Sequence, residues 1–318
     1  MLNWVVVGIG DIATRRVLPA IDLESRGRLY GVVTRDPEKG RRYSENVWTS
    51  LDPALADPQV DVIYLATPVA LHAPQTIAAL EAGKHVLCEK PVAMHYQEAK
   101  SMEEAAARSG RVFGVPYYRR CYPKVQRAKQ MIADGVIGRP VFAEASNHGW
   151  FDAADGFRGW LVDPALSGGG PLYDIGSHRI DLFNYLFGTP VRVTGQISRV
   201  VHARPVEDSA TVLIEYENGV RGVVDVRWHC RSERDELRIT GTDGVLDLSP
   251  LNSPELRYPG GVEHLPIHAN IHYPYIENYV SALVDGTPLI SSGRTAMVTD
   301  WVTEQVMRAA SATTDSAT

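Results

Sequence analysis

Residues 3–13 read Asn-Trp-Val-Val-Val-Gly-Ile-Gly-Asp-Ile-Ala, a valine-rich run followed by a glycine-containing turn. The run is typical of a buried parallel strand. The turn fits the pattern G-x-G-x-x-A, in which Gly8 permits a tight bend, Gly10 lets backbone approach a pyrophosphate, and Ala13 lets a helix pack close to the sheet. The helix expected to follow, to about Leu23, presents free N–H groups at its start. Strand, turn and helix in this order predict a dinucleotide-binding unit.

The same alternation of strand and helix continues along the N-terminal half. Strands are expected at 29–33, 60–66, 85–88 and 112–115, with helices at 70–82 and 96–108. This rhythm predicts a doubly wound parallel sheet of the Rossmann type, which we assign to residues 1–120. Ligands of such sheets lie beyond the carboxyl ends of the strands. Gly8, Thr34, Thr67 and Lys90 fall at four of these ends.

The end of the second strand, Thr34-Arg35-Asp36, bears on the choice of dinucleotide. NAD-binding units commonly place an acidic residue there, on the ribose 2′-hydroxyl. An arginine beside a hydroxyl suits a 2′-phosphate instead, so we favour NADP over NAD. The alternative is that Arg35 is only solvated and that Asp36 contacts the ribose.

Lys90 lies between Glu89 and Pro91, at the end of an expected strand. Proline restricts its own backbone and that of the residue before it, so Lys90 stands on rigid backbone. A lysine held in this way can stabilise negative charge that develops on a substrate oxygen. The alternative is an exposed ion pair with Glu89, which contributes little.

The segment 168–181, Gly-Gly-Gly-Pro-Leu-Tyr-Asp-Ile-Gly-Ser-His-Arg-Ile-Asp, carries a second candidate site. Pro171 suits the first position of a helix. In that helix Asp174 and His178 lie four residues apart, on one face. A carboxylate and an imidazole beside a glycine turn can converge on a small molecule. The alternative is a core helix with one hydrogen-bonded histidine.

In the C-terminal half, apolar and polar residues alternate with the two-residue period of an antiparallel sheet. Extended runs are expected at 141–147, 191–202, 209–216, 221–228, 237–241 and 245–248, with hairpin signals at Asn218-Gly219 and Asp243-Gly244. We assign residues 121–318 to an α+β domain with a large, mostly antiparallel open sheet. The charged run 231–236 is interpreted as a solvated loop, residues 273–284 and 294–310 as closing helices, and residues 311–318 as a frayed end.

Overall composition excludes several classes of protein. The net charge is 32 − 38 = −6, which argues against a nucleic-acid surface, and the sequence has no run apolar enough for a transmembrane helix. The N-terminus lacks a basic leader, and Cys88, Cys121 and Cys230 form no metal-binding or disulfide pattern. We therefore expect a cytoplasmic protein with reduced thiols, no metal site, and no nucleic-acid or membrane partner.

These motifs in this order resemble the Gfo/Idh/MocA oxidoreductases over essentially the whole chain: Gly8-Ile9-Gly10, Glu89-Lys90-Pro91, and Gly168-Gly169-Gly170 followed by Asp174, His178 and Asp181. The resemblance implies hydride transfer between a nicotinamide cofactor and a secondary alcohol or ketone of a sugar, cyclic polyol or sugar derivative. It implies a catalytic group of Lys90, Asp174 and His178. The implied cofactor residues are Gly8, Gly10, Asp11, Ile12, Thr34, Arg35, Thr67, Pro68, His72, Glu89 and Lys90, and the implied substrate residues are Tyr118, Arg119, Trp160, Asp174 and His178.

The resemblance also implies a homodimer or homotetramer formed through the C-terminal sheet. Two departures from the family pattern are Leu161, where many members have arginine after the tryptophan, and Val69, where asparagine is common. The aromatic residues Trp150, Phe151, Phe157 and Trp160 can form either a wall for a sugar ring or plain core. Other functions on the same fold are a redox-neutral glycosidase that uses NAD transiently, a non-catalytic sugar or dinucleotide sensor, and a reductase of nucleotide-linked keto-sugars.

Overall fold

The computed structural model describes residues 1–152 and 158–315, which form two compact units. The first unit comprises Met1–Tyr118 and His268–Met297, and the second comprises Arg119–Ile267 and the residues from Val298 onward. The boundary lies two residues before the expected one after residue 120. The return of residues 268–297 to the first unit departs from the expected continuous division. Its cause is the packing of the helix at 273–284, whose Tyr279 ring lies 5.7 Å from the Trp4 ring.

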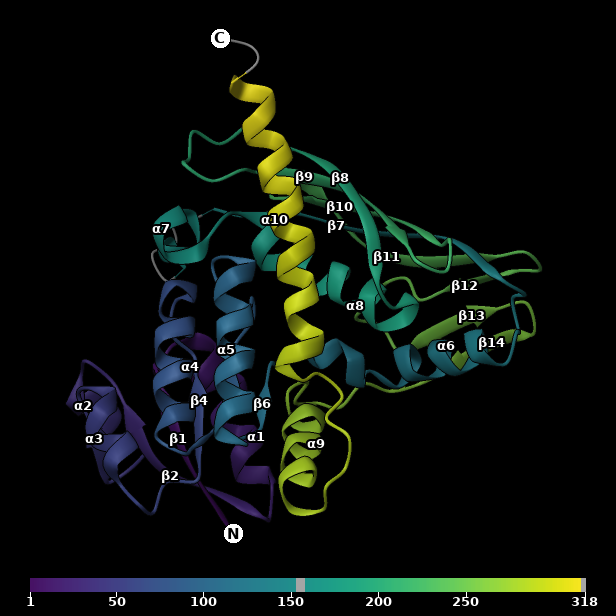
Figure 1. The fold of residues 1–318 in the computed structure, drawn as a ribbon. Coiled ribbons are helices and arrows are strands. Elements are labelled where there is room, and N and C mark those ends of the chain that lie inside the picture. The colour runs from purple at the N-terminus through teal and green to yellow at the C-terminus, as the bar shows by residue number, and fades with distance from the viewer. Residues whose placement is uncertain (153–157, 316–318) are drawn as a thin grey trace. The chain divides into compact units, whose positions relative to one another are not determined.

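The first unit contains a six-stranded parallel sheet (Figure 1). Its strands are β1 (Leu2–Val7), β2 (Gly27–Val33), β3 (Asn46–Trp48), β4 (Val62–Leu65), β5 (His85–Cys88) and β6 (Phe113–Gly114). They lie in the order β3-β2-β1-β4-β5-β6, which confirms the predicted Rossmann arrangement. Its helices are α1 (Leu18–Leu23), α2 (Pro37–Gly40), α3 (Leu51–Ala56), α4 (His72–Glu81), α5 (Tyr96–Ser109) and α9 (Tyr273–Val284).

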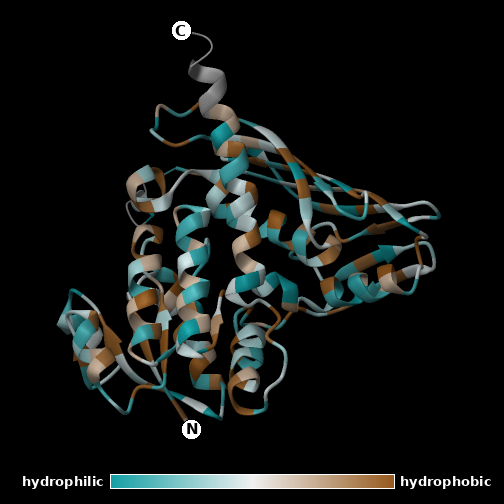
Figure 2. Cartoon of the chain, viewed as in Figure 1, coloured by the Kyte–Doolittle hydropathy of each residue, from teal (hydrophilic) through white to brown (hydrophobic). Residues whose placement is uncertain are grey.

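The core of this unit follows from the apolar strands. All four residues of β4 are buried, as are the last four of β1, because parallel strands are covered on both faces. Helices α4 and α5 pack against each other, and the turns of α5 that face the viewer in Figure 2 are largely hydrophilic. The short β3, α2 and α3 were not predicted, since elements this short carry little periodic signal.

The second unit contains an eight-stranded sheet, in the order β14-β13-β12-β11-β7-β10-β9-β8. The strands are β7 (Pro140–Trp150), β8 (Pro190–Ser198), β9 (Ser209–Tyr216), β10 (Arg221–Arg227), β11 (His229–Gly241), β12 (Val245–Asp247), β13 (Glu255–Tyr258) and β14 (Gly261–His264). Only the β7–β10 pair among these described strands is parallel. The predicted mostly antiparallel sheet is confirmed.

The interpretation of residues 231–236 as a solvated loop is wrong, because these residues belong to β11. Arg234 and Asp235 pair with His148 and Asn147 of β7, after a shift of register that begins at His229. The side chains from Arg231 to Arg234 are exposed to solvent, while the backbone of the strand pairs with β7. A run of charged residues predicts that the side chains are exposed to solvent. Exposed side chains occur on the open face of a strand as well as in a loop.

The helices of the second unit are α6 (Pro123–Ala133), α7 (Pro164–Ser167) and α8 (Ser177–Phe187), and α10 (Gly293–Asp315) begins in the first unit and continues into the second. Helix α8 packs on β7 and β10, where a Cβ on Gly222 would lie 2.7 Å from the ring of Phe183. Helix α10 extends beyond the expected end at residue 310, and residues 316–318 lie outside the described part of the chain. None of the helices described here is long and apolar enough to span a membrane.

Candidate active site

The turn after β1 has the geometry that the glycine pattern predicts. Gly8 has a φ of +89°, and its N–H donates to the Val33 carbonyl at 2.9 Å. A Cβ on Gly8 would lie 2.7 Å from the Ala66 carbonyl oxygen, so only glycine fits between β1 and the end of β4. Around Gly10, by contrast, no atom lies within 4 Å of such a Cβ. The second glycine therefore leaves backbone open to an approaching group.

The chain after this turn forms a π-helical segment, Ala13–Val17, that leads into α1. Ala13 is fully buried, as its expected packing against the sheet requires. Asp11 pairs with Arg15 at 3.1 Å, and an open hollow of about 550 Å³ is lined by Asp11, Ile12, Arg15 and Arg16. Two expected cofactor residues thus border open space beside a turn with exposed backbone.

At the end of β2, Asp36 and Arg35 have different surroundings. The Asp36 carboxylate accepts the Lys39 N–H at 3.1 Å and caps α2. The Asp36 N–H donates to the Thr34 hydroxyl oxygen at 3.2 Å. Arg35 is exposed, and its guanidinium makes no hydrogen bond or ion pair with any other residue in the described ranges. The Lys39 ammonium donates to the Ile9 carbonyl, which brings a second cation to the glycine turn.

After β4, the expected cofactor residues Thr67, Pro68 and His72 form a tight cluster. The Thr67 hydroxyl donates to the Gln75 side-chain oxygen at 2.8 Å. His72 is almost completely buried, and its ring nitrogens lie 3.0 Å from the Thr67 carbonyl and 2.9 Å from the Pro91 carbonyl. Burial lowers the pKa of His72. The ring contacts the carbonyls of Thr67, after β4, and of Pro91, after β5, so it joins the ends of these two strands.

Glu89, at the end of β5, is a buried carboxylate with a defined set of partners. It is 7% exposed, accepts the Tyr64 hydroxyl at 2.7 Å and the Lys90 N–H at 3.2 Å, and faces the His272 ring nitrogen at 3.6 Å. Burial on its own would raise the pKa of Glu89, but the hydrogen bond and charge of His272, with smaller effects of Tyr64 and Lys90, lower it. Glu89 is therefore buried. The alternative in which Glu89 and Lys90 form an exposed ion pair does not describe this carboxylate.

His272 was not identified from the sequence. It immediately precedes α9, is 2% exposed, and its ring centroid lies 4.6 Å from that of Tyr118, an expected substrate residue. Its contact with Glu89 depends on the return of residues 268–297 to the first unit. No local pattern around His272 points to Glu89, because the two residues are far apart in the sequence.

In the second unit, the glycine segment leads into the helix that carries Asp174 and His178. Gly168 has a φ of +83°, Leu172–Gly176 is π-helical, and α8 continues from Ser177. The predicted helix exists, but its first turn is wider than an α-helical turn. Such π-helical turns are frequent at functional sites. Asp174 is paired with Arg158 at 3.0 Å, and His178 is 6% exposed in the first turn of α8.

Two ion pairs hold α8 just after His178, one buried and one partly buried. Asp181 accepts two hydrogen bonds from Arg120, one of them from Nε at 3.0 Å, and Arg179 pairs with Asp235. Burial raises the pKa of Asp181, although Arg120 partly offsets this effect. Removing one partner of such a pair leaves an uncompensated buried charge, so these contacts fix the helix firmly.

The remaining expected substrate residues differ in accessibility. Trp160 is 36% exposed in the 3₁₀ turn Gly159–Val162, and Tyr118 and Arg119 begin another such turn, Tyr118–Cys121. Leu161, the departure from the family pattern, is 5% exposed and packs with Val206 and Trp228.

The aromatic residues before the glycine segment form separate contacts. Trp150 is 39% exposed, with the Arg231 guanidinium 4.0 Å above its ring. Phe151 lies 4.5 Å from the Trp228 ring and packs against the same small core. Phe157 lies outside the described residues. Trp150 and Trp160 are thus the more exposed of these aromatic residues, whereas Phe151 packs against a small core.

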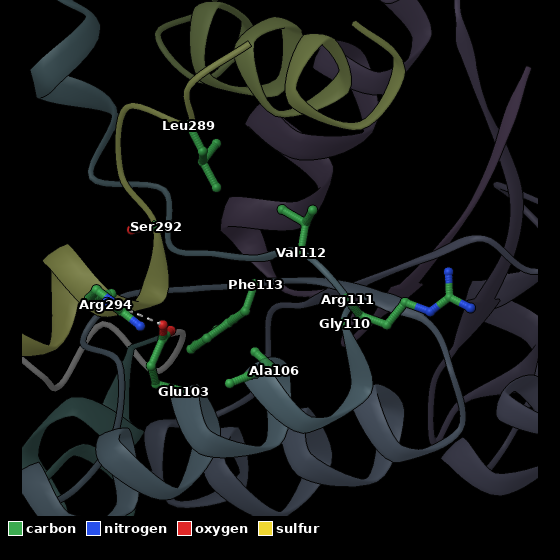
Figure 3. Close-up of a pocket in the computed structure, with 10 residues that line it drawn as sticks. Glu103, Ala106, Gly110, Arg111, Val112, Phe113, Leu289, Ser292 and Arg294 are labelled. Carbon is green, nitrogen blue, oxygen red and sulfur yellow. Dashed lines mark hydrogen bonds and ion pairs between the residues drawn. The ribbon is translucent and has the colours of Figure 1, made fainter. Parts of the chain in front are cut away.

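A second hollow of the first unit, about 300 Å³, lies beside α5 (Figure 3). It is lined by Glu103, Ala106, Ala107, Gly110, Arg111, Val112, Phe113, Leu289, Ser292 and Arg294. Arg294 is paired with Glu103 at 3.4 Å, and Arg111 points away from that pair. No predicted site residue contributes to this hollow. Within residues 1–152 and 158–315 there is also no group of three potential metal ligands.

Comparisons with known proteins agree with this geometry. Residues 2–117 match the family described as "Oxidoreductase family, NAD-binding Rossmann fold", and residues 125–247 match "GFO/IDH/MocA C-terminal domain". A 1,5-anhydro-D-fructose reductase of Ensifer adhaerens is 29% identical over 297 residues, which cover 89% of this chain and 88% of the relative. A levoglucosan dehydrogenase of Pseudarthrobacter phenanthrenivorans is 32% identical over 236 residues, 66% of this chain and 60% of that enzyme.

Among solved structures, GenD2 from gentamicin A biosynthesis, in complex with NAD, is 28% identical and superposes with a TM-score of 0.84, covering 98% of this chain and 94% of that chain. Both halves of the chain thus match the same family, in the same order. The chain belongs to the Gfo/Idh/MocA oxidoreductases, and it is an enzyme with an NAD-binding Rossmann domain.

Proposed function

We propose that this enzyme transfers a hydride between a nicotinamide dinucleotide, preferably NADP, and a secondary alcohol or ketone carbon of a sugar, cyclic polyol or sugar derivative. The observation that carries the cofactor proposal is the end of β2. Asp36, which could otherwise accept from a ribose hydroxyl, is engaged as the cap of α2. Arg35 is exposed beside the Thr34 hydroxyl, and this pair suits a 2′-phosphate.

The residues of the first unit fit a dinucleotide. Gly8 allows the tight turn and Gly10 leaves backbone open there, and the helix start at Asp11 and Ile12 provides N–H groups for phosphate oxygens. Thr67 and Pro68 would border the cofactor, while the buried His72 would support Thr67 and Pro91 from behind. A bound nicotinamide supplies the hydride acceptor or donor. The protein must supply substrate binding, orientation and proton transfer.

For the substrate, we propose that Lys90, Asp174 and His178 act as the catalytic group. His178 would accept the proton of the reacting hydroxyl, because imidazole is the side chain whose ordinary pKa lies nearest neutrality. Lys90 would stabilise negative charge on the substrate oxygen, with the buried Glu89 fixing the backbone beside it. Asp174 would orient substrate hydroxyls or His178. Tyr118, Arg119 and Trp160 would border the sugar.

The two curated relatives support a sugar substrate, since their names are those of a reductase and a dehydrogenase of anhydro sugars. We also propose a homodimer or homotetramer formed through the sheet of the second unit. The half-exposed Leu213 and the partly exposed Phe142 support this proposal. Leu213→Glu should then lower the mass measured by sedimentation, and an unchanged mass would contradict this interface.

The cofactor proposal is tested by fluorescence titration of the wild type and Arg35→Asp with NADPH and NADH. NADPH should bind more tightly to the wild type, and Arg35→Asp should reverse the order. Arg42→Asp is a control that makes the same charge change on a nearby exposed residue. Tighter binding of NADH by the wild type would reject the NADP preference and leave the oxidoreductase proposal in place.

The reaction is tested by screening sugars and polyols for stoichiometric change in cofactor absorbance. Net reduction or oxidation of the cofactor supports the proposal. Product formation without net cofactor change would indicate the redox-neutral glycosidase. Tight cofactor binding with no turnover of any polyol, ketose or nucleotide-linked keto-sugar would indicate a sensor.

A further inference from the structure

Two adjacent acidic residues, Glu207 and Asp208, have no role in the proposed reaction and were not singled out in the sequence. They precede β9, and their exposed fractions are only 3% and 2%. Buried carboxylates are rare unless they are paired or accept several hydrogen bonds. Their partners therefore indicate what they do.

Glu207 accepts backbone N–H groups from the glycine segment that begins the helix carrying Asp174. Its Oε2 accepts the Gly170 N–H at 2.9 Å, and its Oε1 accepts the Leu172 N–H at 3.1 Å. N–H groups in the first turn of a helix lack partners within the helix. Pro171, at the start of this helix, provides no side-chain cap. The cap comes instead from Glu207, which is remote in the sequence.

The backbone of Glu207 also fits closely against Gly170. A Cβ on Gly170 would lie 2.1 Å from the Glu207 carbonyl oxygen, so no larger residue fits there without a shift. The absence of a side chain at Gly170 lets the segment before β9 approach and brings the Glu207 carboxylate to the N–H groups of Gly170 and Leu172. The need for glycine at this position thus arises from Glu207.

The two hydrogen bonds from Gly170 and Leu172 to Glu207 form a clamp, which Gly170 connects to Asp174 through its own N–H and carbonyl groups. While the Gly170 N–H donates to Glu207, the Gly170 carbonyl accepts the N–H of Tyr173 and of Asp174, each at 3.1 Å. The carbonyl of Asp174 in turn accepts the Ser177 hydroxyl at 3.3 Å, one residue before His178. A displacement of Glu207 would therefore shift the first turn of the helix that carries Asp174 and His178.

Asp208 makes a similar clamp on a different segment. Its carboxylate accepts the N–H groups of Val200, Val201 and His202 at 2.8 to 3.0 Å. These donors belong to the connection between β8 and β9, not to the glycine segment. Asp208 is thus a matched control for Glu207: an adjacent buried carboxylate that holds backbone, but not the backbone of the catalytic helix.

From these contacts we propose that Glu207 is a positioning residue for Asp174 and His178, a role that rests on the proposed catalytic function of those two residues. Glu207 holds the glycine turn in the one geometry that places the first helical turn correctly. It touches neither substrate nor cofactor. Its loss should lower kcat by displacing Asp174 and His178, and should leave cofactor binding by the first unit unchanged.

The experiment compares Glu207→Ala, Glu207→Gln and Asp208→Asn with the wild type and with His178→Ala. Hydrogen exchange followed by mass spectrometry reads the clamp directly. In Glu207→Ala the peptide containing Gly170 and Leu172 should lose protection, whereas in Asp208→Asn the peptide containing 200–202 should lose it. Unchanged protection around Gly170 in folded Glu207→Ala would overturn the clamp whatever the enzyme's function.

Steady-state kinetics then read the positioning role. Glu207→Ala should lower kcat by about 10- to 100-fold, the range expected when a catalytic group is displaced by about 1 Å. Glu207→Gln retains one acceptor oxygen and should recover part of this loss, with the cofactor Kd unchanged in both variants. Asp208→Asn should lower the melting temperature with little change in kcat.

Two outcomes would overturn the positioning role. One is that folded Glu207→Ala or Glu207→Gln keeps the wild-type kcat while His178→Ala loses it. The other is that Asp208→Asn lowers kcat as much as Glu207→Ala, which would indicate general destabilisation. If His178→Ala itself keeps full activity, the proposed function fails, and the positioning role fails with it, while hydrogen exchange still decides whether the clamp exists.

Discussion

Glu89 in the first unit and Glu207 in the second are both buried carboxylates, 7% and 3% exposed, that lie beside proposed catalytic residues. Burial acts to raise the pKa of each. In Glu89 the contact with His272, the hydroxyl of Tyr64 and the charge of Lys90 outweigh burial, and the pKa is lowered. In Glu207 burial outweighs the hydrogen bonds from Gly170 and Leu172, and the pKa is raised. Burial alone therefore does not decide the charge of a carboxylate. The largest effect opposing burial comes from the His272 side chain at Glu89 and from a backbone N–H donor at Glu207.

The contrast also separates two ways of supporting a catalytic residue. Glu89 gives Lys90 a fixed anionic neighbour and accepts its backbone N–H. Glu207 gives Asp174 and His178 a fixed backbone. A change at the first carboxylate should be visible in charge-dependent properties, and a change at the second mainly in geometry.

The largest effect is expected for Lys90→Ala, which removes the cation beside Glu89. Turnover should fall by about 1,000-fold, the upper range for loss of one group that stabilises charge on a reacting oxygen. Cofactor affinity, measured by fluorescence titration, should remain largely intact. Lys100→Ala, a lysine of α5 outside the site, is the control. Comparable turnover in Lys90→Ala and the wild type would reject the proposed role.

Glu89→Gln should produce the largest change in stability. It removes the anion that faces His272 and should lower the free energy of unfolding by about 3 kcal/mol near neutral pH. The pKa of Glu89 is lower in the folded protein than in the unfolded chain. The ionised carboxylate therefore stabilises the folded protein at any pH above the ordinary glutamate pKa, and this stabilisation is lost as the pH falls through the folded pKa. Urea unfolding should therefore show wild type and variant converging in acid. A constant difference across this range would contradict the lowered pKa.

Glu207→Gln should show the opposite pH dependence with a smaller effect, about 2 kcal/mol, because one backbone donor then faces an amide NH₂. The pKa of folded Glu207 is raised, so the folded state binds a proton more readily than the unfolded state. Between the ordinary and the raised pKa, this group therefore stabilises the wild type more as pH falls. The same unfolding series should show wild type and variant diverging in acid. Convergence would remove the distinction between the two carboxylates.

The smallest effect is expected for Tyr64→Phe, which deletes the hydroxyl that donates to Glu89 at 2.7 Å. The loss should be about 1 kcal/mol at neutral pH, because His272 and the Lys90 N–H still hold the carboxylate. Tyr30→Phe, which deletes the hydroxyl that donates to Asp57 at 3.1 Å, is the control for loss of a tyrosine hydrogen bond elsewhere in the unit. A loss as large as that in Glu89→Gln would mean that Tyr64, not His272, keeps Glu89 ionised.

Much of the fold could be predicted because its signals are local. The strands at 85–88 and 209–216 and the helix at 273–284 have the expected bounds, since each carries a clear hydrophobic pattern. The strand at 231–236 was missed because its side chains are all polar or charged, and only its pairing with β7 makes it a strand. The short β13 and β14 were missed because four-residue strands carry little periodic signal.

Local sequence was enough to predict the glycine turn at Gly8, the position of Lys90 at a strand end, and the helix of Asp174 and His178. These features depend on a positive φ, on residue period and on neighbours along the chain, all of which are local. The contact of His272 with Glu89 and the capping of the Gly170 N–H by Glu207 follow from tertiary packing and have no local signal. Such contacts join residues far apart in the sequence, and a hydrogen bond between them exists only once packing has brought donor and acceptor together and removed the water that would otherwise satisfy both.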